Sequence, residues 1–383
     1  MDAVSVTAPH GFVAGGTACG IKAEGLDLAL VDAGAPVAAA GVFTANTAAA
    51  PPVHLSRHHV ADGSIRAVVL SSGCANAATG EAGARAAART ADAVAAHLGC
   101  AATEVAVCST GPIGNVVPVD RIEAGLSQLE LTDDGGPVAA RAILTTDSRP
   151  KEETYAGDGF VVGGMAKGAG MLRPDMATML AVVTTDAVAD PALLDRVLHR
   201  AVDRSFNALN VDGCESTNDT VILLASGASG TAPDEDALGE AVELVCRRLA
   251  RHMAEDAEGA TRVVEIELSG AADDATALTL ARAVADSALV RSSFYGADPN
   301  WGRVVAALGS TRLPFDPDAV AVAYAGVPVA EGGVDVGADH DRISEKLAGD
   351  FTVTVSVGEG PGSCSLLTTD LTPEYVRFNG ERS

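Results

Sequence analysis

Aromatic residues and lysines are scarce in this chain. Aromatic side chains make up 3% of its 383 residues, although 48% of the residues are hydrophobic. A core must therefore be built from Ala, Val, Leu and Ile, and such composition is typical of a folded protein. Only four lysines are present (Lys22, Lys151, Lys167 and Lys346). A lysine in an unusual setting is therefore a candidate for a specific role.

Positive charge is also in short supply, because the net charge is −25. Binding to nucleic acid needs clustered Lys and Arg, so this balance argues against it, as it does against attraction to an anionic membrane surface. No apolar run approaches the roughly 18–20 residues that span a bilayer. The N-terminus lacks a basic region followed by an apolar stretch, so no signal peptide is indicated. We expect a soluble, cytoplasmic protein.

Several familiar catalytic and metal-binding patterns are missing. The sequence has no C-x-x-C, G-x-S-x-G, H-E-x-x-H or P-loop motif, and its eight histidines show no metal-ligand spacing. We therefore expect neither a metal site nor a cofactor. The seven dispersed cysteines indicate reduced, mostly buried thiols. Cys214 is a possible thiol nucleophile, but nothing nearby would lower its pKa, so a small buried thiol is favoured.

Helix-like and strand-like segments alternate along the chain. The helix at 190–209 has the clearest start, with Asp190 as N-cap and Pro191 at the first helical position. No linker divides the chain, and the mixed order favours α/β or α+β layers in which helices cover sheets. The segments expected to form regular structure are helices at 81–99, 190–209 and 236–255, and strands at 65–73, 103–111, 263–270 and 351–358.

The segment 159–187 combines glycines, a lysine and a strand start. Lys167 is flanked by glycines, which allow a ligand to approach the backbone closely, so Lys167 is a candidate cationic contact. The alternative is a flexible connector with a solvated lysine. Downstream, Thr178 begins an apolar strand after a loop that contains Pro174.

The Thr178 hydroxyl has a chemical option at this position. It can attack the carbonyl of Ala177 in an N→O acyl shift, and hydrolysis of the ester then frees an α-amine on Thr178. That amine, with an ordinary pKa of about 7.7–8.0, is a usable general base for the hydroxyl at neutral pH. Threonine at a strand start is nonetheless common, and an ordinary structural residue is the alternative.

At these residues the sequence resembles the ornithine acetyltransferase (glutamate N-acetyltransferase) family. The resemblance covers nearly the whole chain and rests on motifs in a fixed order, which together are specific. These are GF at 11–12, GIK at 20–22, GCANAATG at 73–80, STGPIG at 109–114, ILTTDSRPKE at 143–152, AKGAGMLRPDMATMLAVVTTDA at 166–187, STNDT at 216–220, EGATR at 258–262, GADPNWGR at 296–303 and DLTPEYVRFN at 370–379.

The resemblance implies self-cleavage between Ala177 and Thr178, giving an α chain of residues 1–177 and a β chain of residues 178–383. In such enzymes the freed threonine takes acetyl from N-acetylornithine and passes it to glutamate by a ping-pong mechanism. Some members also accept acetyl-CoA, which is a second candidate donor. The resemblance further implies that the α and β chains associate, as (αβ)2 or a larger assembly.

The resemblance also assigns site residues. Thr110 and Gly111 match the family's oxyanion pair, where the alternative is an ordinary turn after a strand. The matching substrate-contacting positions are Thr145, Lys167, Thr178, Glu258, Asn379 and Ser383. For Glu258 the alternative is the solvated end of a helix. The turn around Trp301 is a structural feature or a site wall, and it is left out of catalysis.

The sequence departs from the family pattern at three places. Cys74 and Cys214 stand where Asn and Asp are usual, and the C-terminal FNGERS is shorter or differently spaced than the family's ending, with Ser383 in place of the terminal Ser/Thr that contacts substrate. The implied fold is a two-lobed α/β structure with a layered β-sheet core, reminiscent of N-terminal-nucleophile enzymes. Two other functions remain open. One is a self-processing amidohydrolase or aminopeptidase, in which water accepts the acyl group, and the other is an amino-acid-binding protein that never cleaves.

Overall fold

The computed structural model describes residues 5–173 and 179–381. Ala177, Thr178 and Ser383, which the sequence marked as site residues, lie outside the described residues. The chain forms two compact units: Met1–Asn207 with Cys214–Met253, and Ala208–Gly213 with Ala254–Ser383. The proposed cleavage point divides the chain differently, so the two-chain division stays a prediction.

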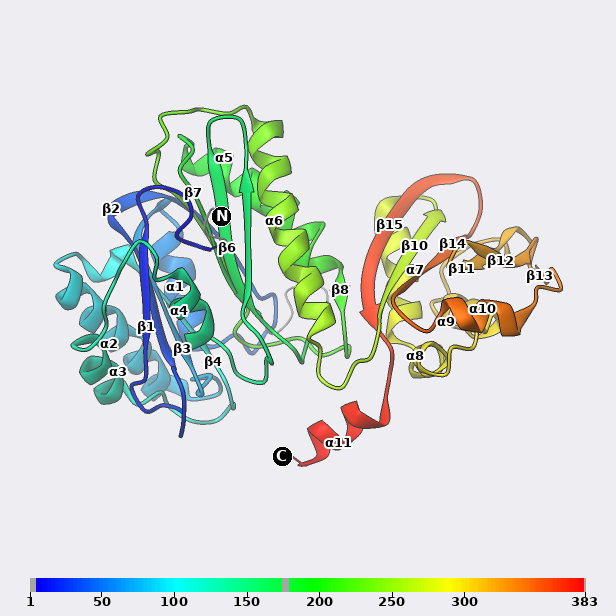
Figure 1. The fold of residues 1–383 in the computed structure, drawn as a ribbon, viewed down its shortest axis with the longest axis horizontal. Helices are drawn as coiled ribbons and strands as arrows, with labels where there is room; N and C mark the ends of the chain where they lie inside the picture. The colour runs from blue at the N-terminus through cyan, green and yellow to red at the C-terminus, as the bar shows by residue number, and fades with distance from the viewer. Residues whose placement is uncertain (1–4, 174–178, 382–383) are drawn as a thin grey trace. The chain divides into compact units, whose positions relative to one another are not determined.

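The first unit is built on an eight-stranded sheet among the described residues, shown in blue to green in Figure 1. Its order is β4-β3-β2-β9-β7-β6-β5, with β1 paired to β2. The strands are β1 (Val13–Thr17), β2 (Leu28–Phe43), β3 (Ser64–Ser72), β4 (Val105–Thr110), β5 (Lys151–Ala156), β6 (Val161–Lys167), β7 (Leu180–Thr185) and β9 (Thr220–Ala225).

The long strand β2 divides this sheet into two halves. Its register against β3 shifts between Asp32 and Val37, and beyond that irregularity it pairs with β9. Apolar side chains from both halves share one core cluster, which includes Val68 and Leu70 of β3 together with Val182 of β7. The two halves therefore pack face to face, as the layered sheet expected from the sequence requires.

Helices cover the outer faces of the two halves. The helices of this unit are α1 (Pro51–Val60), α2 (Gly80–Leu98), α3 (Val119–Leu126), α4 (Gly136–Ala142), α5 (Pro191–Asp203) and α6 (Glu235–Glu255). α2 and α3 bury Val94 and Ile122 in a cluster with β3 and β4. On the other side, Val245 and Leu249 of α6 approach Gly164 of β6. Helices thus flank a double sheet, and this confirms the predicted fold class.

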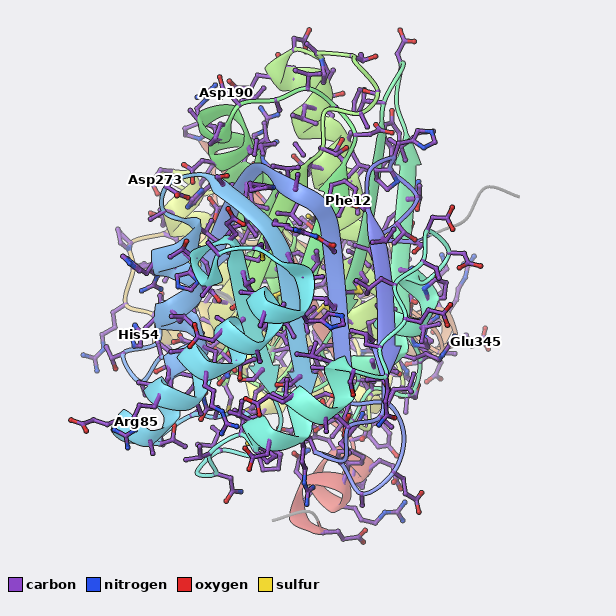
Figure 2. The ribbon with its side chains drawn as sticks, turned by 90° about the vertical axis from the view of Figure 1, so that its left-hand side faces the viewer. Phe12, His54, Arg85, Asp190, Asp273 and Glu345 are labelled. Atoms are coloured by element: carbon purple, nitrogen blue, oxygen red, sulfur yellow. The ribbon has the colours of Figure 1, made fainter. Side chains whose placement is uncertain are left out.

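The helix predictions hold where capping residues mark the ends. Asp190, labelled in Figure 2, caps the start of α5. Its carboxylate accepts from the Leu193 N–H at 2.7 Å. α2 ends at Gly99, whose φ of 70° is left-handed. α5 stops at Asp203, whereas the predicted segment ran to 209, because a 3₁₀ turn (Phe206–Ala208) follows. Across the described ranges, no helix combines the length and apolar character that crossing a membrane requires.

The second unit contains a seven-stranded sheet, again counted over the described residues, in the order β13-β12-β11-β14-β10-β15-β8. Its strands are β8 (Leu209–Asn210), β10 (Val263–Gly270), β11 (Ala321–Tyr324), β12 (Val327–Glu331), β13 (Val334–Asp335), β14 (Phe351–Ser356) and β15 (Gly360–Thr369). Its helices are α7 (Asp274–Asp286), α8 (Ala288–Tyr295), α9 (Trp301–Ser310), α10 (His340–Lys346) and α11 (Pro373–Glu381). The turn before Trp301 has a structural role, because Asn300 caps α9.

Candidate active site

Thr110 and Gly111 lie where strand β4 ends. β4 is buried along its whole length, and its last residue, Thr110, is 3% exposed. The Thr110 carbonyl accepts from the N–H groups of Gly73 and Cys74 at 2.8 and 3.0 Å. Gly111 has φ of 138°, and a Cβ there would lie 2.5 Å from the Cys74 nitrogen. Only glycine fits this position, because a side chain would clash with the backbone of Gly73 and Cys74.

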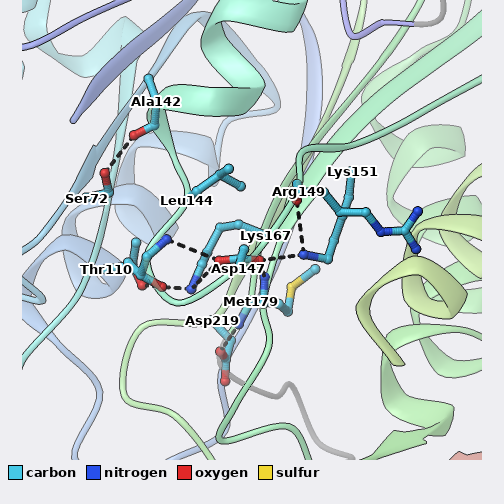
Figure 3. Close-up of polar contacts among 12 residues, drawn as sticks. Ser72, Thr110, Ala142, Leu144, Asp147, Arg149, Lys151, Lys167, Met179 and Asp219 are labelled. Carbon is cyan, nitrogen blue, oxygen red and sulfur yellow. Dashed lines mark hydrogen bonds and ion pairs between the residues drawn. The ribbon is translucent and has the colours of Figure 1, made fainter. Parts of the chain in front are cut away.

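Lys167 brings a positive charge to Thr110. It is the last residue of β6 and is 2% exposed. Its ammonium Nζ lies 3.4 Å from the Thr110 hydroxyl oxygen, as Figure 3 shows. Because an ammonium can only donate, Thr110 must accept this hydrogen bond and keeps its own hydroxyl hydrogen free to donate elsewhere. A positioned O–H beside a cation is suited to stabilise a developing oxyanion.

The carboxylate of Asp147 links this lysine to a second one. Its Oδ1 accepts from the Lys151 ammonium at 2.7 Å, and Lys167 Nζ lies 3.8 Å from its Oδ2. The side chains of Asp147 and Lys151 are both 0% exposed. Burial acts to raise the pKa of Asp147, but the charges of Lys167 and Lys151 outweigh it and hold that pKa at about 2. Asp147 is therefore a fixed negative charge that orients two buried cations.

The loop that carries Asp147 also carries Thr145. The Thr145 N–H donates to Asp147 Oδ2 at 3.1 Å, and the Gly168 N–H donates to Oδ1 at 2.6 Å. Next to Thr145, the Leu144 carbonyl accepts from the ammonium of Lys22 at 3.0 Å. Three of the four lysines of the chain thus gather around one loop.

A second buried carboxyl group, Asp219, directly precedes strand β9 and contacts Met179, the residue before strand β7. The N–H of Met179 donates to Asp219 Oδ1 at 2.8 Å, and the Thr220 N–H donates to the Met179 carbonyl at 3.3 Å. Asp219 is 0% exposed, and burial raises its pKa well above the usual range. Among the described residues, its Oδ2 has no hydrogen-bond partner. Asp219 therefore anchors the residue that directly follows Thr178 in the chain (Figure 3).

Glu258 and Asn379 belong to the second unit, whereas Thr110, Thr145 and Lys167 belong to the first. Glu258 lies in the turn after α6 and is half-buried. Next to it, the Gly259 carbonyl accepts from the Thr372 hydroxyl at 2.6 Å, and a Cβ on Gly259 would clash with the backbone of α11. Asn379 is on α11, where its amide donates to the Tyr375 carbonyl at 3.1 Å. Within this unit, the segments of Glu258 and Asn379 are therefore packed together.

The chain matches the model of the ArgJ family over residues 13–383. It belongs to the ArgJ family. The Arginine biosynthesis bifunctional protein ArgJ of Thermobifida fusca is 49% identical over 384 residues, which cover 99% of this chain and 100% of that protein. The protein of the same name from Mycobacterium tuberculosis is 48% identical, covering 100% and 97% respectively.

A solved structure agrees with this membership. The crystal structure of the Arginine biosynthesis bifunctional protein argJ from Bacillus halodurans is similar with a TM-score of 0.50 and 32% identity. The match covers 52% of this chain and 96% of that one. This ArgJ-family chain is therefore an enzyme of arginine biosynthesis, and the acyltransferase class expected from its motifs agrees with the family.

The alternative given for Lys167 and the expectation given for Cys214 are wrong for this ArgJ-family chain. Lys167 is neither in a loop nor solvated, because it ends a buried strand and contacts Thr110. Cys214, expected to be buried, is exposed. It lies in the segment just before Ser216 and Asn218, whose side chains turn inward while Cys214 does not. Cys74 is buried, and burial raises its pKa, so it is no activated thiol.

Asp147, Lys151, Lys22 and Asp219 were not singled out from the sequence as site residues. Asp147 stands in the polar stretch TTDSRP, which reads as a surface turn. The available signal was the scarcity of lysine, because Lys22 and Lys151 are two of only four. Asp219 gave no local signal, since its burial depends on the pairing of β7 with β9.

Proposed function

We propose that this chain is a self-processing acetyltransferase that moves acetyl from N-acetylornithine to glutamate through an ester on Thr178. The observation that carries the proposal is the contact of Lys167 with Thr110 beside the buried Asp147. In the strand pairing, Lys167 lies opposite Leu180, which is two residues after Thr178. The Lys167 ammonium and the Thr110 hydroxyl therefore lie close to the start of β7, the strand that follows Thr178 in the sequence.

Processing begins with attack of the Thr178 hydroxyl on the Ala177 carbonyl. The C–O bond of an ester forms, the C–N bond to Thr178 breaks, and the hydroxyl proton passes to the nitrogen, which becomes the α-amine. Water then hydrolyses the ester and releases Ala177 as a carboxylate. The freed amine next to the hydroxyl is the general base, so no Ser-His-Asp triad is needed.

Transfer follows in two half-reactions. The Thr178 hydroxyl attacks the acetyl carbonyl of N-acetylornithine, the amide C–N bond breaks, and ornithine leaves with the proton. The amine of glutamate then attacks the acetyl ester, the C–O bond breaks, and Thr178 regains its proton. In both steps the Thr110 hydroxyl and the Gly111 N–H donate to the oxyanion, which is worth a few kcal/mol per donor.

The remaining assignments rest on the resemblance to ornithine acetyltransferases. Lys167 binds a substrate carboxylate, Glu258 binds an amino group, and Thr145 and Asn379 orient polar groups, with Ser383 as a further contact. The α chain (1–177) and the β chain (178–383) remain associated, as (αβ)2 or a larger assembly. Acetyl-CoA is a second donor in this proposal, and no cofactor takes part.

A denaturing gel tests the self-processing step. We expect the wild-type protein to give two bands, for residues 1–177 and 178–383, and Thr178→Ala to give one inactive full-length band. Thr178→Ser is the matched control, because it keeps the hydroxyl and should still be cut. Normal cleavage of Thr178→Ala would overturn the assignment of the nucleophile.

The transfer step is tested by measuring acetylglutamate formation with N-acetylornithine and with acetyl-CoA in separate reactions. Acetylglutamate from the first donor supports the proposal, and its formation from the second shows the wider donor range. Release of acetate without acetylglutamate would contradict the proposal and favour the hydrolytic function, in which water is the acceptor.

A further inference from the structure

Lys22 lies next to the turn formed by Thr110 and Gly111, through its contact with Gly73. It belongs to the connection between β1 and β2, whose backbone is fixed by the buried carboxylate of Asp27. The N–H groups of Cys19 and Lys22 donate to Asp27 at 2.6 and 2.9 Å. The position of Lys22 is therefore set by a buried carboxylate rather than left to a surface loop.

The aliphatic stem of Lys22 crosses the backbone beside Gly111. A Cβ on Gly73 would lie 2.5 Å from Cγ of Lys22, so the stem is in close contact with that glycine. Gly73 is in turn packed against Gly111, since a Cβ on Gly111 would lie 2.6 Å from the Gly73 carbonyl carbon. Lys22, Gly73 and Gly111 thus form a continuous packed row that leads from the lysine to the oxyanion turn.

The ammonium of Lys22 has spare hydrogen-bonding capacity. It donates to the Leu144 carbonyl at 3.0 Å, and within residues 5–173 and 179–381 it has no ion-pair partner. An ammonium carries three donors, so two remain for a ligand. Lys22 is half-exposed, whereas Lys151 and Lys167 are buried and share Asp147. Of the three clustered lysines, Lys22 is therefore the one that can reach an incoming molecule with the least rearrangement.

Lys22 itself faces the carboxylates of Asp27 and Asp147 and the ammonium of Lys167. The acceptor of the proposed reaction, glutamate, carries two carboxylates and one amine, whereas ornithine carries one carboxylate and a second amine. If Lys167 binds the carboxylate that both molecules share, the second carboxylate of glutamate needs another cation. The side-chain amine of ornithine would be repelled from that same cation.

We infer that Lys22 binds the side-chain carboxylate of the acceptor and so selects glutamate in the second half-reaction. This inference rests on the proposed function. In this inference the donor and the acceptor are selected by different protein groups. An acidic residue binds the amine of the donor's side chain, and Lys22 binds the carboxylate of the acceptor's side chain.

The test compares two acceptors that differ only in side-chain charge. Acetyl-enzyme is formed with N-acetylornithine and then mixed with glutamate or with glutamine, and kcat/KM is measured for each acceptor. We expect Lys22→Met to lower kcat/KM for glutamate about 10- to 100-fold, mainly through KM, and to lower it far less for glutamine. Lys22→Arg, which keeps the charge, should restore part of the preference. Lys346→Met, which removes the exposed fourth lysine in α10, is the matched control and should behave as wild type.

The outcomes separate this inference from the proposed function. An equal loss with glutamate and glutamine in Lys22→Met would show a merely structural role and overturn the inference. An unchanged preference for glutamate would overturn it as well. If the wild-type protein forms no acetyl ester on residues 178–383, seen as one added acetyl mass, the proposed function fails and the inference fails with it.

Discussion

Replacing Lys151 by methionine tests whether the buried ion pair beneath the site holds the first unit together. Lys151→Met keeps a stem of similar length but removes the ammonium that lies 2.7 Å from Asp147. Removing one partner of a buried pair costs roughly 3–5 kcal/mol, because the other charge is left without compensation. Asp147 keeps Lys167 at 3.8 Å, so we expect the lower end, about 3 kcal/mol.

The matched control is an ion pair with the same spacing on the surface. Arg85 and Glu81 of α2 are also four residues apart, but their side chains are 72% and 94% exposed, and Arg85 points outward in Figure 2. Arg85→Met should change stability by no more than about 0.5 kcal/mol. Both ion pairs belong to the first unit, whereas the single tryptophan, Trp301, belongs to the second. Unfolding in urea should therefore be followed by far-UV circular dichroism rather than by tryptophan fluorescence. Equal losses in the two variants would refute the reasoning.

The same pair predicts a pH dependence. The folded-state pKa of Asp147 is about 2, below its ordinary value of 3.8, so its contribution is present above about pH 4 and is lost as the pH falls toward 2. By linkage this amounts to about 2 kcal/mol. In Lys151→Met the pKa of Asp147 should rise, and the acid limb of the stability curve should become shallower. An unchanged acid limb would contradict the assignment.

Three other variants give direct tests. Gly111→Ala places a Cβ 2.5 Å from the Cys74 nitrogen, and steady-state kinetics should show kcat lowered by at least about 100-fold. Asp219→Asn keeps an acceptor for the Met179 N–H and should be cut near the wild-type rate, whereas a gel time course should show slower cutting for Asp219→Ala. Burial raises the pKa of Glu152 from 4.5 to about 7, so stability is lost as the pH rises from about 4.5 to about 7, where only the unfolded chain carries the charge. With its partial exposure discounted, Glu152→Gln should raise the unfolding free energy by about 1 kcal/mol at pH 8 and not at pH 4.

The parts of the fold that sequence reasoning predicted are those with local signals. α5 carries its own start signal in Asp190 and Pro191, and the predicted strand at 263–270 coincides with β10. β2 was missed because its 16 residues include Gly34 and Pro36, which locally indicate a turn. Its extended conformation comes from pairing with strands on both sides, which no short window of sequence contains.

The candidate site divides in the same way. The residues by themselves marked Lys167 and Thr178, and the resemblance added Thr110 and Gly111, but nothing in the sequence alone placed Lys167 against Thr110. Thr110 and Lys167 are 57 positions apart in the sequence, and their contact requires β4 and β6 to meet across the double sheet. Asp147 was not predicted as a site residue, because its burial depends on tertiary packing. The polar stretch TTDSRP around it does not indicate that its carboxylate is buried.

The strand order of the first unit has a consequence for how unfolding depends on protein concentration. β9 and β7, which belong to residues 178–383, lie between β2 and β6, which belong to residues 1–177. If the proposed cut occurs, unfolding releases two separate chains, and mass action then makes the midpoint of unfolding rise with protein concentration. The uncut Thr178→Ala chain would show a weaker dependence, because only dissociation of the larger assembly, and not separation of α from β, would contribute. Refolding of the cut protein after dilution would then require the two chains to meet again.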